Sequence, residues 1–535
     1  MSTDTSPTKP TKSPRIGKRM GKKRAKNVQG IALTPPDPAL RNAIKKTLDK
    51  SGEKKSTRRQ MAGKLLLSWL ADHGRFVQNE VSERYYLYRP THKLYRLKSE
   101  LWDAWLFSLT GVYPATVDFT CLVDECKAVA IFAPRQPVVR VSAWDADEKV
   151  LRVSRFDGMV YRLDGKSIED EANGEGVLFD DDPLWLPYKP VFTKSGVLGW
   201  STETLPNWER DADVHGLAYR VWVLTTFFTE LCPSRPYAMF LGEKNSGKST
   251  ALRVLLKLMF GPIGQVSGVP DKRDGFTALA SSSHLLVLDN VDQFKRWLQD
   301  KLARLATGAR DHYRQLYTGN ERGDVIYRCW LALTARTPDT LKRDDLADRL
   351  LLLPVGMIPE IERKKETDMY VEAAASRGQW WGEVLLTANQ AVASIRRGDL
   401  VGPPQLRMAD WEALGRIFAK NESQEPLWDK FCRDLRRAQS GFLLADNLIV
   451  EGLDAWLTIA ANPGREMTGK ELHQELGGIL FRTNKPSSDW PKSVVGFGKR
   501  LAGIRRDLKT IYRVEWETKS HREVYRFWPD SVITL

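Results

Sequence analysis

Cysteine is scarce in this sequence, with five residues among 535. They are Cys121, Cys126, Cys232, Cys329 and Cys432. None of them belongs to a C-x-x-C pair or stands at zinc-site spacing from a histidine. This usage fits a reducing cytosol and argues against a cysteine-based metal site.

Long apolar runs are also missing, because none reaches the roughly 18 residues that a membrane span requires. The longest, residues 221–231, predicts a short buried helix. The N-terminus is polar throughout and lacks the apolar core of a secretory signal. We therefore expect a cytoplasmic protein with no membrane partner.

Acidic residues are fewer than basic ones: 67 against 82, for a formal net charge of +15 and a pI near 9.4. Such an excess favours a polyanionic partner, and nucleic acid before a membrane. Much of it lies in the first thirty residues, so the folded part is only mildly basic. The length is enough for about three domains.

The N-terminal third predicts two regions. Residues 1–58 are rich in Lys, Arg, Pro, Ser and Thr and predict a disordered basic tail, either a nucleic-acid-binding arm or a solubilising segment. Residues 59–190 predict a small α+β domain with a hairpin over 85–97. Its aromatic residues alternate with arginine, which suits a base-stacking platform or, as we favour, a half-buried sheet.

A phosphate-binding loop is the most specific motif. An apolar strand over 237–241 leads into G-E-K-N-S-G-K-S, and an apolar-periodic helix follows. This strand–loop–helix context lets backbone N–H groups and a helix N-terminus surround phosphate oxygens. The sequence thus predicts an ATP and Mg²⁺ site formed by Gly242, Glu243, Lys244, Asn245, Ser246, Gly247, Lys248, Ser249 and Thr250.

A second apolar strand, 284–290, ends in Asp289 about forty residues after the loop. Asp289 is the expected acid that holds Mg²⁺ together with Ser249. ATPases of the additional-strand type usually carry glutamate directly after this aspartate, where it polarises the attacking water. In this sequence the position is Asn290. Asp292 or Glu243 can substitute for it, or Asn290 can merely orient the water; the sequence does not choose.

The order of the parts resembles superfamily 3 viral and plasmid helicases and the related MCM-like AAA+ ATPases of bacterial mobile genetic islands. The matching stretch, 242–355, contains GEKNSGKST, LLVLDN, LATG followed by RQLYT, LALTARTP and DLADRLLLL. The last two motifs overlap further predicted apolar strands, at 330–334 and 350–353. The resemblance implies a multidomain α/β protein with a central P-loop AAA+ (ASCE) ATPase core over 191–355. A helical lid would follow over 356–460.

The resemblance also implies roles for later residues. Thr334 would be sensor 1, where asparagine is usual, and Arg349 the arginine finger offered to a neighbouring subunit. Alternatively, Arg349 makes a surface salt bridge with Asp345 or Asp348. Arg407 is a candidate second sensor.

The sequence predicts a glycine-bounded hairpin over 313–328. By the same resemblance, it would line the pore of a ring and grip DNA through Asn320 and Arg322 near its tip. The alternative is that this hairpin is ordinary sheet edge.

The C-terminal segment, 461–535, predicts a winged-helix DNA-binding domain. A capping box at 468–471 opens one helix, and an apolar stripe from Phe497 to Leu508 marks a second helix. Two alternating strands follow. Its basic positions are candidate DNA contacts, or merely a solvated face: Lys499, Arg500, Arg505 and Arg506.

Together these features predict a ring-forming ATP-dependent DNA helicase, expected as a hexamer, that replicates a phage, plasmid or integrated element. Single-stranded DNA would pass through the pore, and the winged helix would hold duplex DNA. Two alternatives stay open: an ATP-switched initiator or regulator with little unwinding, and a non-replicative ATPase of a defence or segregation system.

Overall fold

The computed structural model describes residues 37–292, 295–308, 310–314, 322–337, 343–399, 403–444, 447–481, 489–519 and 522–529. These fall into two compact units, each described by itself. One comprises Met1–Trp69 with Trp102–Glu125, and the other Leu70–Leu101 with Cys126–Leu535. This division differs from the predicted domain at 59–190, because the helices and strands of that segment fall in different units.

The first unit is helical. It contains α1 (Pro38–Leu48), most of α2 (Lys55–His73) and α4 (Val117–Ala130), and nearly all of α3 (Glu100–Thr110). Helix α1 begins where the Asp37 carboxylate accepts hydrogen bonds from the backbone of Ala39 and Leu40, at 2.9 and 3.1 Å. Leu40 and Ile44, one turn apart, are buried. The prediction of disorder up to residue 58 is therefore wrong for α1 and the start of α2.

The second unit begins with two antiparallel sheets. The first contains β1 (Gly74–Gln78), β2 (Arg84–Tyr88) and β3 (Lys93–Arg96), and the second β5 (Ser142–Asp145), β6 (Val150–Ser154), β7 (Met159–Leu163) and β8 (Ile168–Ala172). The predicted hairpin is confirmed by the pairing of Tyr85 with Arg96. Tyr85, Tyr86 and Tyr95 are at most 4 % exposed, so their rings belong to the sheet core rather than to a base-stacking surface.

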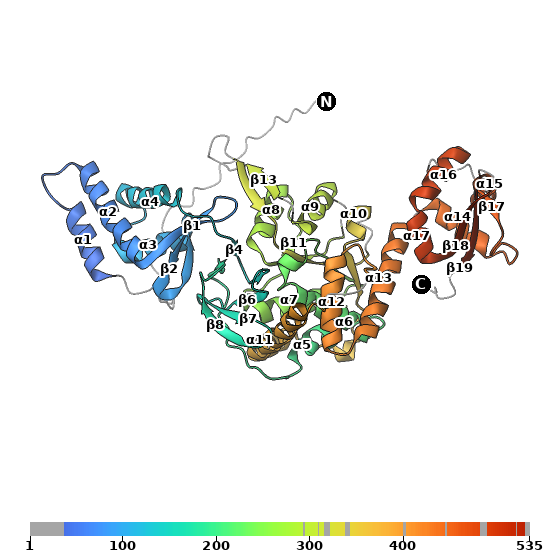
Figure 1. Ribbon diagram of the computed structural model, residues 1–535, viewed down its shortest axis with the longest axis horizontal. Helices are drawn as coiled ribbons and strands as arrows, with labels where there is room; N and C mark the ends of the chain where they lie inside the picture. Colours follow the sequence, from blue (N-terminus) through green and yellow to red (C-terminus); the bar gives the residue numbers. More distant parts are fainter. Residues whose placement is uncertain are drawn as a thin grey trace, which may run out of the picture. The chain divides into compact units, whose positions relative to one another are not determined.

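Five parallel strands form one sheet in the second unit. Figure 1 labels one of them, β11. The five strands are β10 (Tyr237–Leu241), β11 (Ser267–Gly268), β12 (Leu285–Asp289), β15 (Trp330–Ala335) and β16 (Leu350–Pro354). Their spatial order is β11-β12-β15-β10-β16, so β15 lies between β10 and β12 although it follows both in sequence. The predicted strands at 237–241, 284–290, 330–334 and 350–353 are confirmed.

Helices cover both faces of this sheet. Alternate residues of β10 enter two apolar cores: Ala238 and Phe240 share one, Tyr237 and Met239 the other. The first core includes α6 (Ala212–Thr225), α7 (Lys248–Phe260) and α11 (Glu366–Arg397); the second includes α8 (Arg273–Ser282) and α9 (Arg296–Ala306). Burial on both faces explains why these strands read as continuous apolar runs.

An antiparallel hairpin stands between β12 and β15 in the chain. Its strands are β13 (Arg310–Arg314) and β14 (Arg322–Ile326), with Arg314 paired to Arg322. These strands begin and end a few residues earlier than the predicted hairpin over 313–328. Asn320 and the Arg322 side chain lie outside the described residues.

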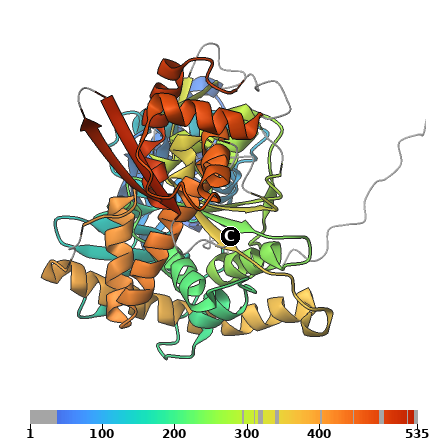
Figure 2. The same ribbon diagram turned by 90° about the vertical axis from the view of Figure 1, so that its right-hand side faces the viewer.

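The C-terminal region follows two more helices, α12 (Ala409–Asn421) and α13 (Glu425–Leu444). It contains α14 (Leu448–Leu457), β17 (Met467–Thr468), α15 (Gly469–Leu480), α16 (Val494–Gly503), α17 (Arg505–Ile511), β18 (Tyr512–Lys519) and β19 (Arg522–Pro529). Figure 2 shows β18 and β19 side by side, and β17 pairs with β19. The Thr468–Glu471 capping box is confirmed.

The apolar stripe from Phe497 to Leu508 does not form one helix, because the chain breaks at Ile504 between α16 and α17. Gly503, a poor helix former, directly precedes the break. Phe497, Leu501 and Leu508 are nonetheless all buried.

None of the five cysteines, all within the described residues, forms a disulfide. Among the described helices, none combines the length and the hydropathy that a bilayer crossing requires.

Candidate functional site: a phosphate loop at the strand ends

The loop between β10 and α7 has a backbone that only certain residues adopt. Gly247 caps α7 in the left-handed region at φ +79°, and Asn245 lies there too at φ +70°. A Cβ atom on Gly242 would lie 2.1 Å from the Val355 carbonyl oxygen, so this position requires glycine. The first amide groups of α7 lack intrahelical partners and carry the positive end of the helix dipole. The loop is therefore a concave set of N–H donors suited to phosphate oxygens.

Lys248, the first residue of α7, folds back over this loop. Its Nζ donates to the Gly242 carbonyl at 2.6 Å, the Glu243 carbonyl at 2.8 Å and Ser246 Oγ at 2.9 Å. Burial lowers the pKa of its ammonium, while the Asp292, Asp289 and Glu243 carboxylates oppose that shift. The ammonium is thus held at the loop mouth, among groups that phosphate oxygens can replace.

Ser249 and Asp289 meet at the ends of the strands. Asp289 Oδ1, at the end of β12, accepts hydrogen bonds from Ser249 Oγ at 2.6 Å and from Thr334 Oγ1 at 2.5 Å. Thr334, on β15, is fully buried and also accepts the Asn290 backbone N–H at 2.9 Å. A hydroxyl and a carboxylate so close together provide the oxygen ligands that Mg²⁺ prefers, so the site fits this ion.

Two further residues beside the loop were not predicted. Arg253, on α7, lies 3.9 Å from Asp289 and 3.7 Å from Glu366. Glu366, at the start of α11, accepts the Thr250 hydroxyl at 2.8 Å. The spacing of Ser249 and Arg253 on one helix face was a usable signal for Arg253. Nothing local marks Glu366, which lies 116 residues from Thr250.

The loop opens into a cavity of about 550 Å³. Apolar side chains from two distant segments line part of it: Trp200, Leu205, Ile358 and Met369. The cavity therefore joins a polar phosphate end, at Lys248 and Ser249, to a partly apolar end large enough for a nucleobase.

Arg349 lies elsewhere, at the start of β16. Its carbonyl accepts the Tyr237 N–H, so it stands at the end of the sheet opposite the loop that follows β10. The five residues of β10 separate the two ends of the sheet by roughly 16 Å, at about 3.3 Å per residue. Arg349 therefore does not serve the loop of its own chain.

Arg349 is 8 % exposed, and its guanidinium donates to the Asp345 carbonyl and to Ser234 Oγ. Burial lowers its pKa. The alternative predicted for Arg349 was a salt bridge with Asp345 or Asp348, yet the Asp345 carboxylate pairs with Arg343 at 2.8 Å and the Asp348 carboxylate with Arg407 at 3.2 Å. Arg407 thus lies beside Asp348 and not at the loop.

The C-terminal basic residues differ in their surroundings. Lys499, Arg500 and Arg506 are exposed, and Arg500 donates to the Asp489 carbonyl. Arg505 stacks on the Trp516 ring of β18, with 3.8 Å from guanidinium carbon to ring centroid. Arg505 therefore joins α17 to the hairpin, whereas Lys499 and Arg506 present their charges to solvent.

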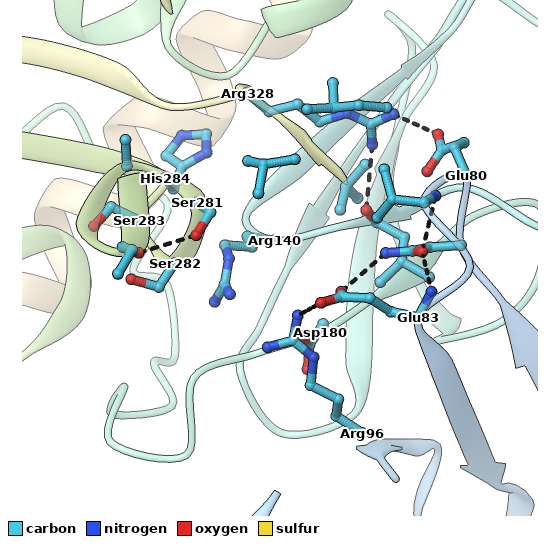
Figure 3. A pocket seen from close by; sticks show the side chains of 18 of the residues that line it. Glu80, Glu83, Arg96, Arg140, Asp180, Ser281, Ser282, Ser283, His284 and Arg328 are labelled. Atoms are coloured by element: carbon cyan, nitrogen blue, oxygen red, sulfur yellow. Dashed lines mark hydrogen bonds and ion pairs between the residues drawn. The ribbon is translucent and has the colours of Figure 1, made fainter. Parts of the chain in front are cut away.

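A second cavity, of about 740 Å³, lies between the first antiparallel sheet, α8 and the end of β14 (Figure 3). Arg328, which follows β14, donates to the Val138 carbonyl at 3.2 Å and pairs with Glu80 at 2.5 Å. Arg96 pairs with Glu83. The base of the β13–β14 hairpin is thus fastened to the loop between β1 and β2 and to Val138 of the same unit.

Comparison with known proteins gives one family match. Residues 208–427 match the family model described as "Actinomycete integrative conjugative element replication protein". No curated protein sequence matches the chain. The matched segment contains the phosphate loop, β12, β15 and Arg349.

Two similar solved structures are both distant from this chain. The NrS-1 C-terminal region in its A-form apo structure has a TM-score of 0.39 at 11 % identity, covering 87 % of this chain and 98 % of its own. A structure described as "SCCmec type IV Cch - active helicase" has a TM-score of 0.39 at 11 % identity. The match covers 85 % of this chain and 92 % of that one. A similarity this distant defines neither fold nor activity.

Proposed function

We propose that this protein is an ATP-dependent DNA helicase that works as a ring, expected as a hexamer, in the replication of a mobile genetic element. One observation carries the proposal: Lys248, Ser249, Asp289 and Thr334 converge at the ends of β10, α7, β12 and β15. The family match over residues 208–427 supports the replicative role. The insertion of β15 between β10 and β12 supports an additional-strand (ASCE) ATPase of the AAA+ type.

Each residue then has a task in ATP hydrolysis. The loop amides and the Lys248 ammonium bind the β- and γ-phosphates, and the Trp200–Leu205 side of the cavity receives the base. Ser249 and Asp289 would hold Mg²⁺, which supplies positive charge against the phosphate oxygens. Thr334 fixes the Asp289 carboxylate through its hydroxyl. Helices α11 to α13 would form the lid.

Arg349 would complete the site of a neighbouring subunit. Its place at the opposite end of the sheet suits a residue offered across an interface. An arginine finger is worth about 10³-fold or more in turnover, so hydrolysis would depend on assembly. To reach a neighbour's phosphate, its guanidinium would release the Asp345 carbonyl.

DNA would bind at two places. The β13–β14 hairpin would line the pore and grip a single strand. The order α14, β17, α15, α16, α17 and the β18–β19 hairpin supports a winged helix, in which Lys499, Arg500 and Arg506 would face duplex phosphates. Replacing Lys499 and Arg506 with alanine should lower the log–log salt slope of duplex binding by roughly 0.9 per lost contact.

The test measures ATP turnover with and without single-stranded DNA, displacement of a labelled strand, and particle mass with ATP. The proposal expects DNA-stimulated turnover, strand displacement and a closed ring. A protein that stays monomeric with ATP, and that hydrolyses ATP at the same rate with and without DNA, contradicts the proposal.

A second candidate is an ATP-switched initiator with little unwinding. Two departures favour it, Asn290 in place of glutamate and Thr334 in place of asparagine. It predicts tight ATP binding, duplex binding that changes with ATP, and negligible turnover. The same assays therefore separate the two functions.

A further inference from the structure

The proposed ATPase lacks a carboxylate at the usual water-activating position. Asn290 follows Asp289 directly, and its amide cannot accept a proton as a carboxylate does. Asp289 cannot take this role as well, because its Oδ1 is already bonded to Ser249 and Thr334. Another acid must stand close to Lys248 if the site turns over.

Asn290 also redirects the chain. Its backbone is left-handed at φ +56°, and the next residue, Val291, is buried and donates its N–H to the Thr334 carbonyl at 2.8 Å. The chain therefore stays attached to β15 for two residues past Asp289. This attachment places Asp292 beyond the end of the sheet, on the side where the loop and α7 begin.

Asp292 is held there by β15 itself. Its Oδ1 accepts the backbone N–H of Arg336, the residue that follows β15, at 2.8 Å. Within the described part of the chain, its Oδ2 has no hydrogen-bond partner. The Asp292 carboxylate is thus held through Oδ1, while Oδ2 makes no hydrogen bond to the described residues.

Glu243 is the remaining candidate. It lies within the loop, where its carbonyl already accepts Lys248, and its side chain is exposed, as is that of Asp292. The structure shows no hydrogen bond that would fix its carboxylate. Asp292 is therefore the better oriented of the two.

We propose that Asp292 is the catalytic carboxylate that orients the attacking water and accepts its proton. The water oxygen bonds to the γ-phosphorus, and the bond from that phosphorus to the bridging oxygen breaks. ADP leaves with the electron pair, and the proton passes from Asp292 to solvent or product phosphate. The inference depends on the proposed ATPase function and names the acid of that same site.

The test replaces Asp292 with asparagine, which keeps the acceptor for Arg336 N–H but removes the base. A general base contributes about 10²- to 10⁴-fold, so kcat should fall by at least about 100-fold. The Kd for a fluorescent ATP analogue should stay near that of the wild type. The variant should therefore retain unhydrolysed ATP after gel filtration. Asp147→Asn, at an exposed turn, is the matched control and should behave as the wild type.

Rescue distinguishes a catalytic from a structural role. Adding Asn290→Asp to Asp292→Asn returns a carboxylate to the site and should restore a large part of the turnover. An aspartate tolerates the left-handed backbone there. If Asp292→Asn turns over like the wild type, or if Glu243→Gln alone loses turnover while binding ATP, the inference is wrong. If the wild type binds no ATP, the proposed function itself fails.

Discussion

Thr334 offers the sharpest test of how the nucleotide site is built, through the change Thr334→Val. The side chain is fully buried on β15, between β10 and β12. Its hydroxyl donates to Asp289 Oδ1 at 2.5 Å and accepts the Asn290 N–H at 2.9 Å. Valine has nearly the same shape but makes neither bond, so the change removes polar contacts with little loss of packing.

The size of the effect follows from those two bonds. A hydrogen bond to a charged group contributes about 1.5–3 kcal/mol, and leaving a buried N–H unpaired costs about 1–3 kcal/mol. Each 1.4 kcal/mol changes an equilibrium constant about tenfold. Losing the bond from the Thr334 hydroxyl to Asp289 should therefore lower the fraction of correctly oriented Asp289 by roughly 10- to 100-fold. We expect turnover to fall by that factor and the Mg²⁺ concentration for half-maximal activity to rise.

The assay is steady-state ATP hydrolysis over a Mg²⁺ titration, with binding of a fluorescent ATP analogue measured in parallel. Thr334→Ser is the control, because it keeps the hydroxyl and should retain most of the activity. Circular dichroism checks that both variants are folded. A valine variant with wild-type turnover and Mg²⁺ dependence would refute the reasoning that Thr334 positions Asp289.

Three other predictions follow from named contacts. Arg349→Ala and Lys248→Ala should each lose turnover, and mixing them should restore part of it; no rescue at any ratio contradicts a finger in trans. Arg328→Ala should reduce DNA stimulation of ATP turnover while basal turnover persists, because it frees the hairpin base from Glu80; unchanged stimulation contradicts this coupling. Burial raises the pKa of Asp181 from 3.8 to about 7. The folded state therefore keeps a proton that the unfolded chain loses above about pH 4, and stability falls as pH rises toward 7. Asp181→Asn should increase the free energy of unfolding at pH 8 by at most about 4 kcal/mol, seen as a higher melting temperature, and should not do so at pH 3.5; a gain equal at both pH values would exclude this cause.

Local patterns in the sequence were enough to predict the strands of the central sheet and the phosphate loop. The strand at 237–241, the glycines at 242 and 247 and the helix from Lys248 are adjacent in the chain, so their physical requirements can be read together. The same holds for the Thr468–Glu471 capping box, whose partners are three residues apart. Buried parallel strands are recognisable because both of their faces are apolar.

Short segments that depend on tertiary burial were not predictable. Helix α1 has only Leu40 and Ile44 as buried residues, within a polar and basic stretch that reads as disordered. The break at Ile504 divides an apolar stripe that continues without interruption in the sequence. In both places the neighbouring packing decides the outcome, and local propensity alone does not.

The sequence by itself determined which residue types the site contains: the loop, an acid after an apolar strand and a threonine where asparagine is usual. Only the tertiary structure decided which of them meet. Asp289 and Thr334 are 45 residues apart and touch because β15 is inserted beside β12. Strand order is set by the packing of whole elements, which no local spacing encodes. For the same reason, the structure favours Asp292 over Glu243, a choice that the sequence left open.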